Sequence, residues 1–96
     1  MVAMPSHWYI YVLQCVDGSL YAGITTDLHR RVDEHNAGPR GARYTRARRP
    51  VTLKESWALP DRSAATRAEA AFKRLTRAQK LAVMEGCRPA PWLSSD

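Results

Sequence analysis

The sequence has 96 residues, a length that suits one domain with a single modest core and leaves no room for a second. Fifteen Lys and Arg against nine Asp and Glu give a net charge of +6, which favours a polyanionic partner such as nucleic acid over an acidic small molecule. No apolar run approaches the about 20 residues of a membrane span, and the N-terminus lacks the pattern of a signal peptide. Cys15 and Cys87 form neither a C-x-x-C pair nor a zinc-binding spacing. We therefore expect a cytoplasmic protein with free thiols and no membrane partner.

Two strands joined by a tight turn are predicted first along the chain. Residues 9–15 are rich in aromatic and β-branched side chains, and residues 20–25 resume the same pattern after the hairpin signal Asp17-Gly18. Antiparallel pairing of the two strands is expected to bring Tyr11 and Tyr21 close together.

A helix is predicted to begin after Asp27, a residue type that favours the N-cap position. Apolar or weakly polar residues recur at helical spacing, namely Leu28, Val32 and His35. Arg31 and His35 are four residues apart, so they share a face of this helix. Gly38-Pro39 ends it, because glycine suits the left-handed position after a helix and proline prevents continuation.

Residues 40–49 are predicted to form a surface loop, since they contain five arginines, one aromatic residue and no acid. The arginines are Arg40, Arg43, Arg46, Arg48 and Arg49. We expect this segment to follow a nucleic-acid backbone through salt-sensitive phosphate contacts, with Tyr44 stacking on a base. The alternative is a connection that is merely solvated.

The second half of the chain is predicted to contain one strand and two helices. In residues 51–57 Val51, Leu53, Glu55 and Trp57 alternate with polar residues, which predicts a strand with one mostly apolar face. A helix with an apolar stripe at Ala65, Ala68, Phe72 and Leu75 then follows the turn at residues 60–63. Thr76 and Gln79 form a capping box that begins the last helix, which ends at Gly86.

The predicted fold class is therefore α/β, a small three-stranded antiparallel sheet flanked by helices in the order β-β-α-β-α-α. Residues 1–7 are expected to be an N-terminal extension, residues 8–86 the domain and residues 87–96 a C-terminal tail.

Two tyrosine motifs and a later arginine resemble the GIY-YIG nuclease family. Tyr9-Ile10-Tyr11 and Tyr21-Ala22-Gly23 stand where this family has Gly-Ile-Tyr and Tyr-Ile-Gly, about ten residues apart. Arg31 follows Gly23 by eight residues, on the predicted helix. Residues 42–45 (Ala-Arg-Tyr-Thr) and Glu69 extend the resemblance over roughly residues 8–85, and the whole pattern is similar to the small single-domain bacterial branch of the family.

The sequence departs from the family pattern at three points. Tyr9 replaces the glycine of the first motif and Ala22 replaces the isoleucine of the second, while both defining tyrosines are present. Many family members also carry an asparagine near the end of the domain, but the only asparagine here is Asn36. That role is therefore unfilled or supplied differently.

The residues and the resemblance together predict a catalytic site for phosphodiester cleavage, made of Tyr11, Tyr21, Arg31, His35 and Glu69. Arg31 offers a planar, permanently charged fork that matches phosphate oxygens; the alternative is a surface arginine paired with Asp27 or His35. The tyrosines can donate hydrogen bonds, or act as a base if cations lower their pKa; the alternative is ordinary packing in the sheet. His35 could accept a proton directly or relay one from Tyr11, and the alternative is a helix-terminal histidine.

The resemblance aligns Glu69 with the metal-binding glutamate of the family. One carboxylate with phosphate oxygens and waters is a normal shell for Mg²⁺, so one Mg²⁺ or Mn²⁺ ion is expected. The alternative is a salt bridge from Glu69 to Lys73, which is compatible with metal binding.

The sequence thus predicts a metal-dependent endonuclease that hydrolyses DNA phosphodiester bonds in DNA repair or recombination, with RNA as the other substrate still open. A protein partner could supply the substrate specificity. Two alternatives are a non-catalytic nucleic-acid-binding module and an adaptor of a repair complex. The predicted nucleic-acid-binding residues are Arg40, Arg43, Tyr44, Arg46, Arg48, Arg49 and Lys73.

Overall fold

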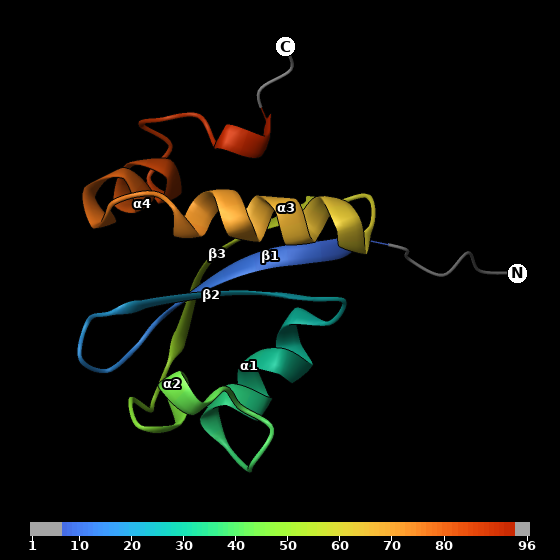
Figure 1. Ribbon diagram of the computed structural model, residues 1–96. Coiled ribbons are helices and arrows are strands. Elements are labelled where there is room, and N and C mark those ends of the chain that lie inside the picture. Colours follow the sequence, from blue (N-terminus) through green and yellow to red (C-terminus); the bar gives the residue numbers. More distant parts are fainter. Residues whose placement is uncertain (1–6, 94–96) are drawn as a thin grey trace, which may run out of the picture.

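The computed structural model describes residues 7–93 of the chain. Its elements are β1 (Trp8–Gln14), β2 (Leu20–Thr25), α1 (Leu28–Asn36), α2 (Arg43–Arg46), β3 (Thr52–Leu59), α3 (Arg62–Lys73), α4 (Arg77–Met84) and the 3₁₀ helix η1 (Pro91–Leu93). The strands form one antiparallel sheet in the order β2-β1-β3. Helices α3 and α4 lie on one side of the sheet, and α1 and α2 lie on the other (Figure 1). This confirms the predicted fold class, with α2 as an additional short helix.

The face of the sheet toward α3 holds the main apolar core. Ile10 and Val12 of the central strand are fully buried there, against Ala65, Ala68 and Phe72 of α3. This is the apolar stripe expected from helical spacing. Burying one side chain such as Phe72 contributes about 1.5–3 kcal/mol, so this layer supplies much of the stability of the fold.

The face toward α1 holds a smaller core with more polar residues. Tyr11 and Leu13 alternate with Ile10 and Val12 along β1 and therefore point to the opposite side of the sheet. Leu28 and Val32 of α1 pack against them, and Asp27 caps this helix through a 3.0 Å bond from Arg30 N–H to its carboxylate. The predicted hairpin thus delivers one tyrosine-bearing face to α1.

The third strand differs from its predicted alternation because it contains a β-bulge. Val12 pairs with Glu55 but Leu13 pairs with Leu53, so Lys54 is the extra residue. Residues on either side of a bulge change their relation to the two faces of the sheet. Trp57 consequently packs with the α3-side core, whereas Leu53 lies opposite Leu13 and keeps 37% of its surface exposed. The expectation that Leu53, Glu55 and Trp57 share one apolar face is wrong.

Residues 90–93 pack against α3. Ala90 is buried, and the ring centroid of Trp92 lies 5.1 Å from that of Trp57 and 6.3 Å from that of Phe72. The prediction of a tail from residue 87 did not anticipate these contacts, and residues 94–96 of that stretch, like residues 1–6 of the expected N-terminal extension, lie outside the described residues.

The predicted capping box is present at Thr76 and Gln79. None of the helices within residues 7–93 has the length and apolar character that a membrane crossing requires.

Candidate functional site

Tyr11 crosses the neighbouring strand at Gly23. The two residues are direct partners in the β1–β2 pairing, and a Cβ atom at position 23 would lie only 2.6 Å from Cζ of Tyr11. A side chain at this position would therefore displace the phenol ring. Gly23, in the second tyrosine motif, therefore leaves the space in which Tyr11, in the first motif, lies across β2.

A chain of buried hydrogen bonds connects Tyr11 to α1 and α2. The Tyr11 hydroxyl oxygen lies 2.8 Å from His35 Nε2, and His35 Nδ1 lies 2.7 Å from Thr45 Oγ1. His35 and Thr45 are fully buried, and Tyr11 is 2% exposed. Because an unpaired polar group costs about 1–3 kcal/mol when buried, this chain must remain fully hydrogen-bonded. Tyr11 and His35, predicted site residues from different elements, are thus in direct contact.

Burial keeps both members of the Tyr11–His35 pair neutral at pH 7. Burial is the main cause that raises the pKa of Tyr11 to about 12, against the opposing effect of the Arg31 guanidinium. Burial also lowers the pKa of His35 to about 4, and the positive charge of Arg31 adds to this shift. The imidazole therefore brings no charge to the site, and the positive charge there belongs to Arg31.

Arg31, a residue of α1, lies beside the phenol of Tyr11. Its Nη1 donates to Glu34 Oε1 at 2.9 Å and to the carbonyl oxygen of Arg40 at 2.7 Å. Partial burial acts to lower the pKa of Arg31, but the hydrogen bonds with Glu34 and Tyr11 outweigh it and raise the pKa above its ordinary value. The guanidinium is therefore always charged. The pairing foreseen as an alternative exists, but its acid is Glu34 and not Asp27.

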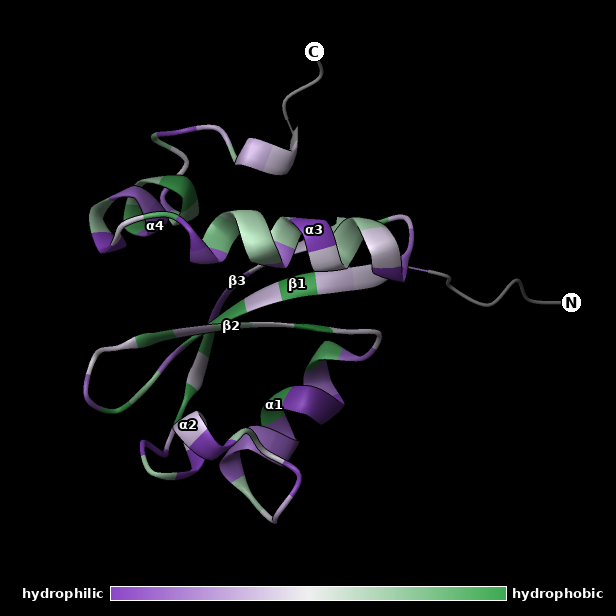
Figure 2. Cartoon of the chain, viewed as in Figure 1, coloured by the Kyte–Doolittle hydropathy of each residue, from purple (hydrophilic) through white to green (hydrophobic). Residues whose placement is uncertain are grey.

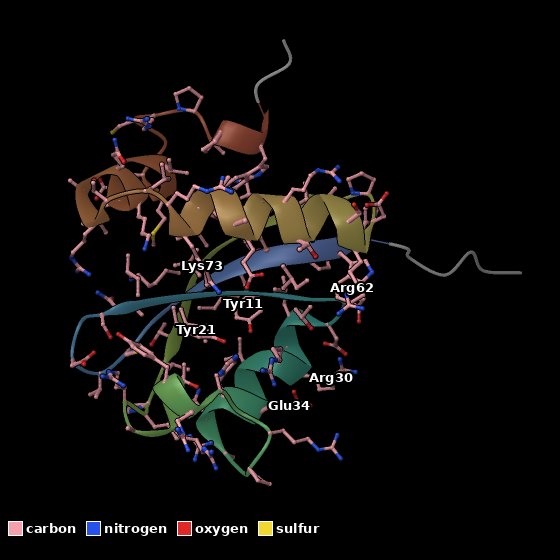
Figure 3. The ribbon with its side chains drawn as sticks, viewed as in Figure 1. Tyr11, Tyr21, Arg30, Glu34, Arg62 and Lys73 are labelled. Carbon is pink, nitrogen blue, oxygen red and sulfur yellow. The ribbon has the colours of Figure 1, made fainter. Side chains whose placement is uncertain are left out.

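Tyr21 and Glu69 complete the surroundings of Tyr11. The ring centroid of Tyr21 lies 5.3 Å from that of His35, and the negative charge of Glu69 is close enough to raise the pKa of Tyr11 slightly, after burial as the main cause. Figure 3 shows both tyrosines on the α1 side of the sheet and Lys73 on the α3 side. Lys73 Nζ lies 3.1 Å from Glu69 Oε2, which is the predicted salt bridge. The five predicted catalytic residues therefore gather around one phenol.

The donors near Glu69 fit a weakly held divalent ion. Within residues 7–93 no three His, Cys, Asp or Glu side chains gather as a ready-made metal site. The Glu69 carboxylate is 23% exposed and its charge acts on the Tyr11 phenol, so it offers a hard oxygen ligand at the edge of the site. Mg²⁺ commonly takes one or two carboxylates and fills its shell with waters and substrate phosphates. Such a donor set suits Mg²⁺ or Mn²⁺ better than a structural zinc ion.

The arginine-rich segment, residues 40–49, contains arginine side chains that are hydrogen-bonded within the protein and others that are exposed. Arg49 donates to the carbonyl oxygens of His35 at 2.6 Å and Gly38 at 2.7 Å, and Arg48 donates to Asp17 Oδ2 at 3.1 Å. Both arginines are half-buried, because they hold the segment against α1 and the β1–β2 turn. The exposed arginines of the segment are Arg40, Arg43 and Arg46. Figure 2 shows hydrophilic residues concentrated over α1 and α2.

The ring of Tyr44 is partly covered by neighbouring side chains, although the residue is 38% exposed. The Arg48 guanidinium carbon lies 3.9 Å from the centroid of the Tyr44 ring, and the Tyr21 ring stacks beside it at 6.0 Å. A nucleic-acid base that stacked on the face under Arg48 would have to displace that side chain.

Sequence reasoning missed Thr45 and misjudged its surroundings. The loop predicted over residues 40–49 contains helix α2, and Thr45 of that helix is fully buried. The sequence signal available was weak: Thr45 is the only hydroxyl-bearing residue of the segment besides Tyr44. Asn36, the only asparagine, bonds Val51 N–H at 2.7 Å and the Val51 carbonyl at 3.0 Å. Its amide is thus committed to holding β3.

Comparisons with known proteins show the family of this chain. The family described as the GIY-YIG catalytic domain matches residues 7–82. A UPF0213 protein of Desulfotalea psychrophila is 51% identical over 73 residues, which are 76% of this chain and 66% of that protein. A UPF0213 protein of Xanthomonas axonopodis pv. citri is 55% identical over 78 residues, which are 81% of this chain and 76% of that protein.

A solved structure is similar as well. The solution structure of a protein from Enterococcus faecalis has a TM-score of 0.58 and 40% sequence identity, covering 96% of this chain and 93% of that one. The chain therefore belongs to the GIY-YIG family, whose domain is a nuclease-type catalytic domain.

Proposed function

We propose that this protein is an endonuclease that hydrolyses phosphodiester bonds of DNA with one divalent metal ion. The observation that carries this proposal is the buried Tyr11–His35 hydrogen bond of 2.8 Å beside the charged Arg31 guanidinium. Phosphodiester hydrolysis needs a route for the proton of the attacking water and positive charge at the phosphate. The two requirements are supplied here by neighbouring groups of β1 and α1.

The proton of the attacking water passes first to Tyr11. His35 is 0% exposed and so has no direct contact with a water on the substrate, whereas its Nε2 atom contacts the Tyr11 hydroxyl. As the Tyr11 oxygen takes the proton of the water, its own proton moves to His35 Nε2. The hydroxide oxygen then bonds to phosphorus, and the bond from phosphorus to the leaving oxygen breaks. Tyr11 thus removes the proton from the attacking water, and His35 is the final proton acceptor.

The directions of the two pKa shifts decide when this transfer occurs. Burial raises the pKa of Tyr11 to about 12 and lowers the pKa of His35 to about 4, so moving a proton from Tyr11 to His35 is unfavourable in the resting protein. The pair is therefore inert until a bound phosphate changes its surroundings. The negative charge of the substrate raises the proton affinity of His35, which favours transfer only when the phosphate is bound.

Substrate reaches the Tyr11 phenol past Arg31, Tyr21 and Glu69. Each of these neighbours of Tyr11 keeps part of its surface exposed, whereas Gly23 and His35 are buried. A phosphate that takes the Arg31 guanidinium away from Glu34 would also open this route. Binding of the phosphate and exposure of the base are thereby linked.

Glu69 is the proposed metal ligand. A divalent ion held there would supply positive charge to the phosphate and lower the pKa of a bound water. Lys73, at 3.1 Å from Glu69, neutralises the carboxylate, and a bound ion would take the place of this partner. The half-buried carboxylate would then be paired in both states.

The exposed arginines of the α2 segment are proposed to hold the DNA backbone. Arg40, Arg43 and Arg46 extend from the segment that also carries Thr45, so phosphate contacts made there lie next to the site. Such contacts are independent of sequence and weaken with salt. A role in repair or recombination, with a protein partner that selects the substrate, would suit a domain whose basic surface reads only the backbone.

A non-catalytic nucleic-acid-binding module is the second candidate, and one observation favours it. Tyr11 is only 2% exposed, so the phenol is closed to bulk solvent in this state. If Arg31 and Tyr21 never move apart, the basic surface would bind DNA without turnover.

The decisive experiment is a cleavage assay with purified protein. Duplex, single-stranded, flap and junction DNA, with matched RNA, are incubated with Mg²⁺ or Mn²⁺ and with a chelator. We expect cleavage only with metal and a loss of at least about 100-fold in Glu69→Gln. Glu85→Gln is the matched control, since that carboxylate lies exposed after α4. Salt-sensitive binding without any cleavage would overturn the proposal and establish the binding module.

A further inference from the structure

The hydrogen-bond chain that begins at Tyr11 does not end at His35. His35 Nδ1 lies 2.7 Å from Thr45 Oγ1, and Thr45 Oγ1 lies 3.0 Å from the carbonyl oxygen of Ala42. Thr45 is 0% exposed, so its hydroxyl has no access to water. The chain therefore runs from β1 through α1 into α2 and stops at a backbone carbonyl.

This last group fixes the direction of every bond in the chain. A carbonyl oxygen can only accept, so the Thr45 hydroxyl must donate its proton to Ala42. The Thr45 oxygen then has only lone pairs left to offer to His35, and Nδ1 must carry the imidazole proton. In the neutral ring the other nitrogen, Nε2, has no proton and accepts from the Tyr11 hydroxyl.

The opposite arrangement is disfavoured by the same geometry. If Thr45 donated to His35 Nδ1, its oxygen and the Ala42 carbonyl oxygen would face each other at 3.0 Å without a proton between them. The Ala42 carbonyl also accepts the Arg46 N–H at 3.0 Å, so its position is held by the first turn of α2. A shift of the Ala42 carbonyl alone therefore cannot relieve the close approach of the two oxygen atoms.

We propose that Thr45 is a positioning residue that holds His35 in the tautomer protonated at Nδ1, so that Nε2 is reserved as the acceptor for the Tyr11 proton. As a statement about catalysis this rests on the proposed nuclease function; as a statement about the tautomer it stands on the hydrogen bonds alone. When Nε2 receives the Tyr11 proton, the ring becomes an imidazolium whose Nδ1–H still donates to Thr45. No partner has to be exchanged during the transfer.

The arginine-rich segment has a second role, which is to position Thr45 beside His35. Arg49 ties this segment to the His35 and Gly38 carbonyls, and a Cβ atom on Gly41 would lie 2.8 Å from the Glu34 carbonyl oxygen. These contacts hold residues 41–49 against α1, which sets the distance from Thr45 to His35. The segment that presents free arginines to DNA thus also orients the proton acceptor.

The test is a direct reading of the His35 tautomer by NMR. Long-range proton–nitrogen correlation of ¹⁵N-histidine-labelled protein at pH 7 distinguishes a protonated from an unprotonated ring nitrogen. For His35 we expect Nδ1 to be protonated and Nε2 unprotonated. In Thr45→Val the proton should move toward Nε2, and single-turnover cleavage should fall by about tenfold or more with unchanged DNA affinity. Thr45→Ser should restore the parent tautomer and a rate well above that of Thr45→Val.

Thr66→Val is the matched control, since the Thr66 hydroxyl also donates to a helix carbonyl, that of Arg62 at 2.8 Å, but is exposed on α3. It should change neither the tautomer nor the rate. Protonation of His35 at Nε2 in the parent protein would overturn the inference, and so would a parent-like tautomer in folded Thr45→Val. Should Thr45→Val fail to fold, the parent and Thr45→Ser spectra decide. Should the parent protein not cleave DNA, the tautomer is still measured, so the failure of the nuclease function is seen separately.

Discussion

The two faces of the central strand bury different kinds of side chain. Toward α3 the buried residues are apolar, as with Ile10 and Phe72, while toward α1 they include the hydrogen-bonded groups of Tyr11, His35 and Thr45. Within residues 7–93, Nε1 of Trp92 on the α3 side is the only buried side-chain polar atom without a partner. Among the described residues, the buried side-chain polar atoms on the α1 side are therefore all hydrogen-bonded, although that side is the more polar one.

This difference separates stability from chemistry. Apolar packing stabilises in proportion to the area buried, whereas a buried hydrogen bond contributes only about 0.5–1.5 kcal/mol net. Variants on the α3 side are expected to act on folding, and variants on the α1 side on cleavage.

Truncation of Phe72 should have the largest effect on stability. Phe72 is 1% exposed, and a buried Phe→Ala change costs about 3–5 kcal/mol through lost burial and the cavity that remains. Urea unfolding of Phe72→Ala gives the free energy of unfolding. Below its unfolding transition the variant should cut DNA near the parent rate. A lost cleavage rate in a protein shown to be folded would contradict the separation of the two faces.

Removal of either charged site residue should abolish cleavage while the fold survives. Arg31→Ala and Glu69→Ala each take away transition-state stabilisation, for which a loss of about 10²–10³-fold in rate is typical. Arg30→Ala is the matched control, because Arg30 directly precedes Arg31, is 58% exposed and also pairs with Glu34, at 3.7 Å. Arg31 also bonds the Arg40 carbonyl, so thermal unfolding of each variant is measured beside the rate. Cleavage at the parent rate in either variant would show that the proposed site is wrong.

Much of the fold could be predicted from local patterns. Asp27 and the Thr76–Gln79 box sit at helix starts as expected, because capping depends on residues within one turn. The run of aromatic and β-branched residues predicted β1, because both faces of a central strand are covered. In β3 the predicted alternation failed, since one inserted residue, Lys54, changes the faces without any mark in the sequence.

The candidate site could be predicted in its members but not in its connections. Tyr11, Arg31 and His35 follow from motif spacing and helix periodicity. Thr45 does not, because its contact with His35 spans ten residues and depends on how α2 packs. Arg49 was expected to face nucleic acid, yet it binds carbonyls eleven and fourteen residues away. Long side chains reach partners that only the tertiary structure specifies.

Acid should destabilise the protein through His35. Its folded pKa of about 4 lies below the ordinary 6.5, so between these values the unfolded chain binds a proton that the folded protein excludes. Stability should therefore be flat above pH 6.5 and fall on acidification by up to about 1.4 kcal/mol per pH unit. Unfolding is measured from pH 7.5 to 4.5 for the parent and His35→Gln. Equal slopes in both proteins between pH 6.5 and 5 would refute this origin.

Neutralising the free arginines should weaken DNA binding with little effect on turnover. Arg40, Arg43 and Arg46 replaced by Gln would remove up to three phosphate contacts, so the slope of log affinity against log salt should fall by at most about 2–3 units. Turnover at saturating DNA should fall much less than in Arg31→Ala. An unchanged slope would show that this segment is a solvated connection and would move the binding surface elsewhere.

The most direct test of the separation compares two neighbouring residues of one strand. Ile10 faces α3 and is 0% exposed, and Tyr11 faces α1 with its hydroxyl on His35. Single-turnover cleavage rates and unfolding free energies are measured for Ile10→Val and Tyr11→Phe. We expect Ile10→Val to lose about 0.5–1.5 kcal/mol of stability at the parent cleavage rate. Tyr11→Phe, which lacks only the hydroxyl and leaves His35 Nε2 without its partner, should lose about 10²–10⁴-fold in rate and about 1–3 kcal/mol of stability, and remain folded. Cleavage by Tyr11→Phe at the parent rate would contradict the account.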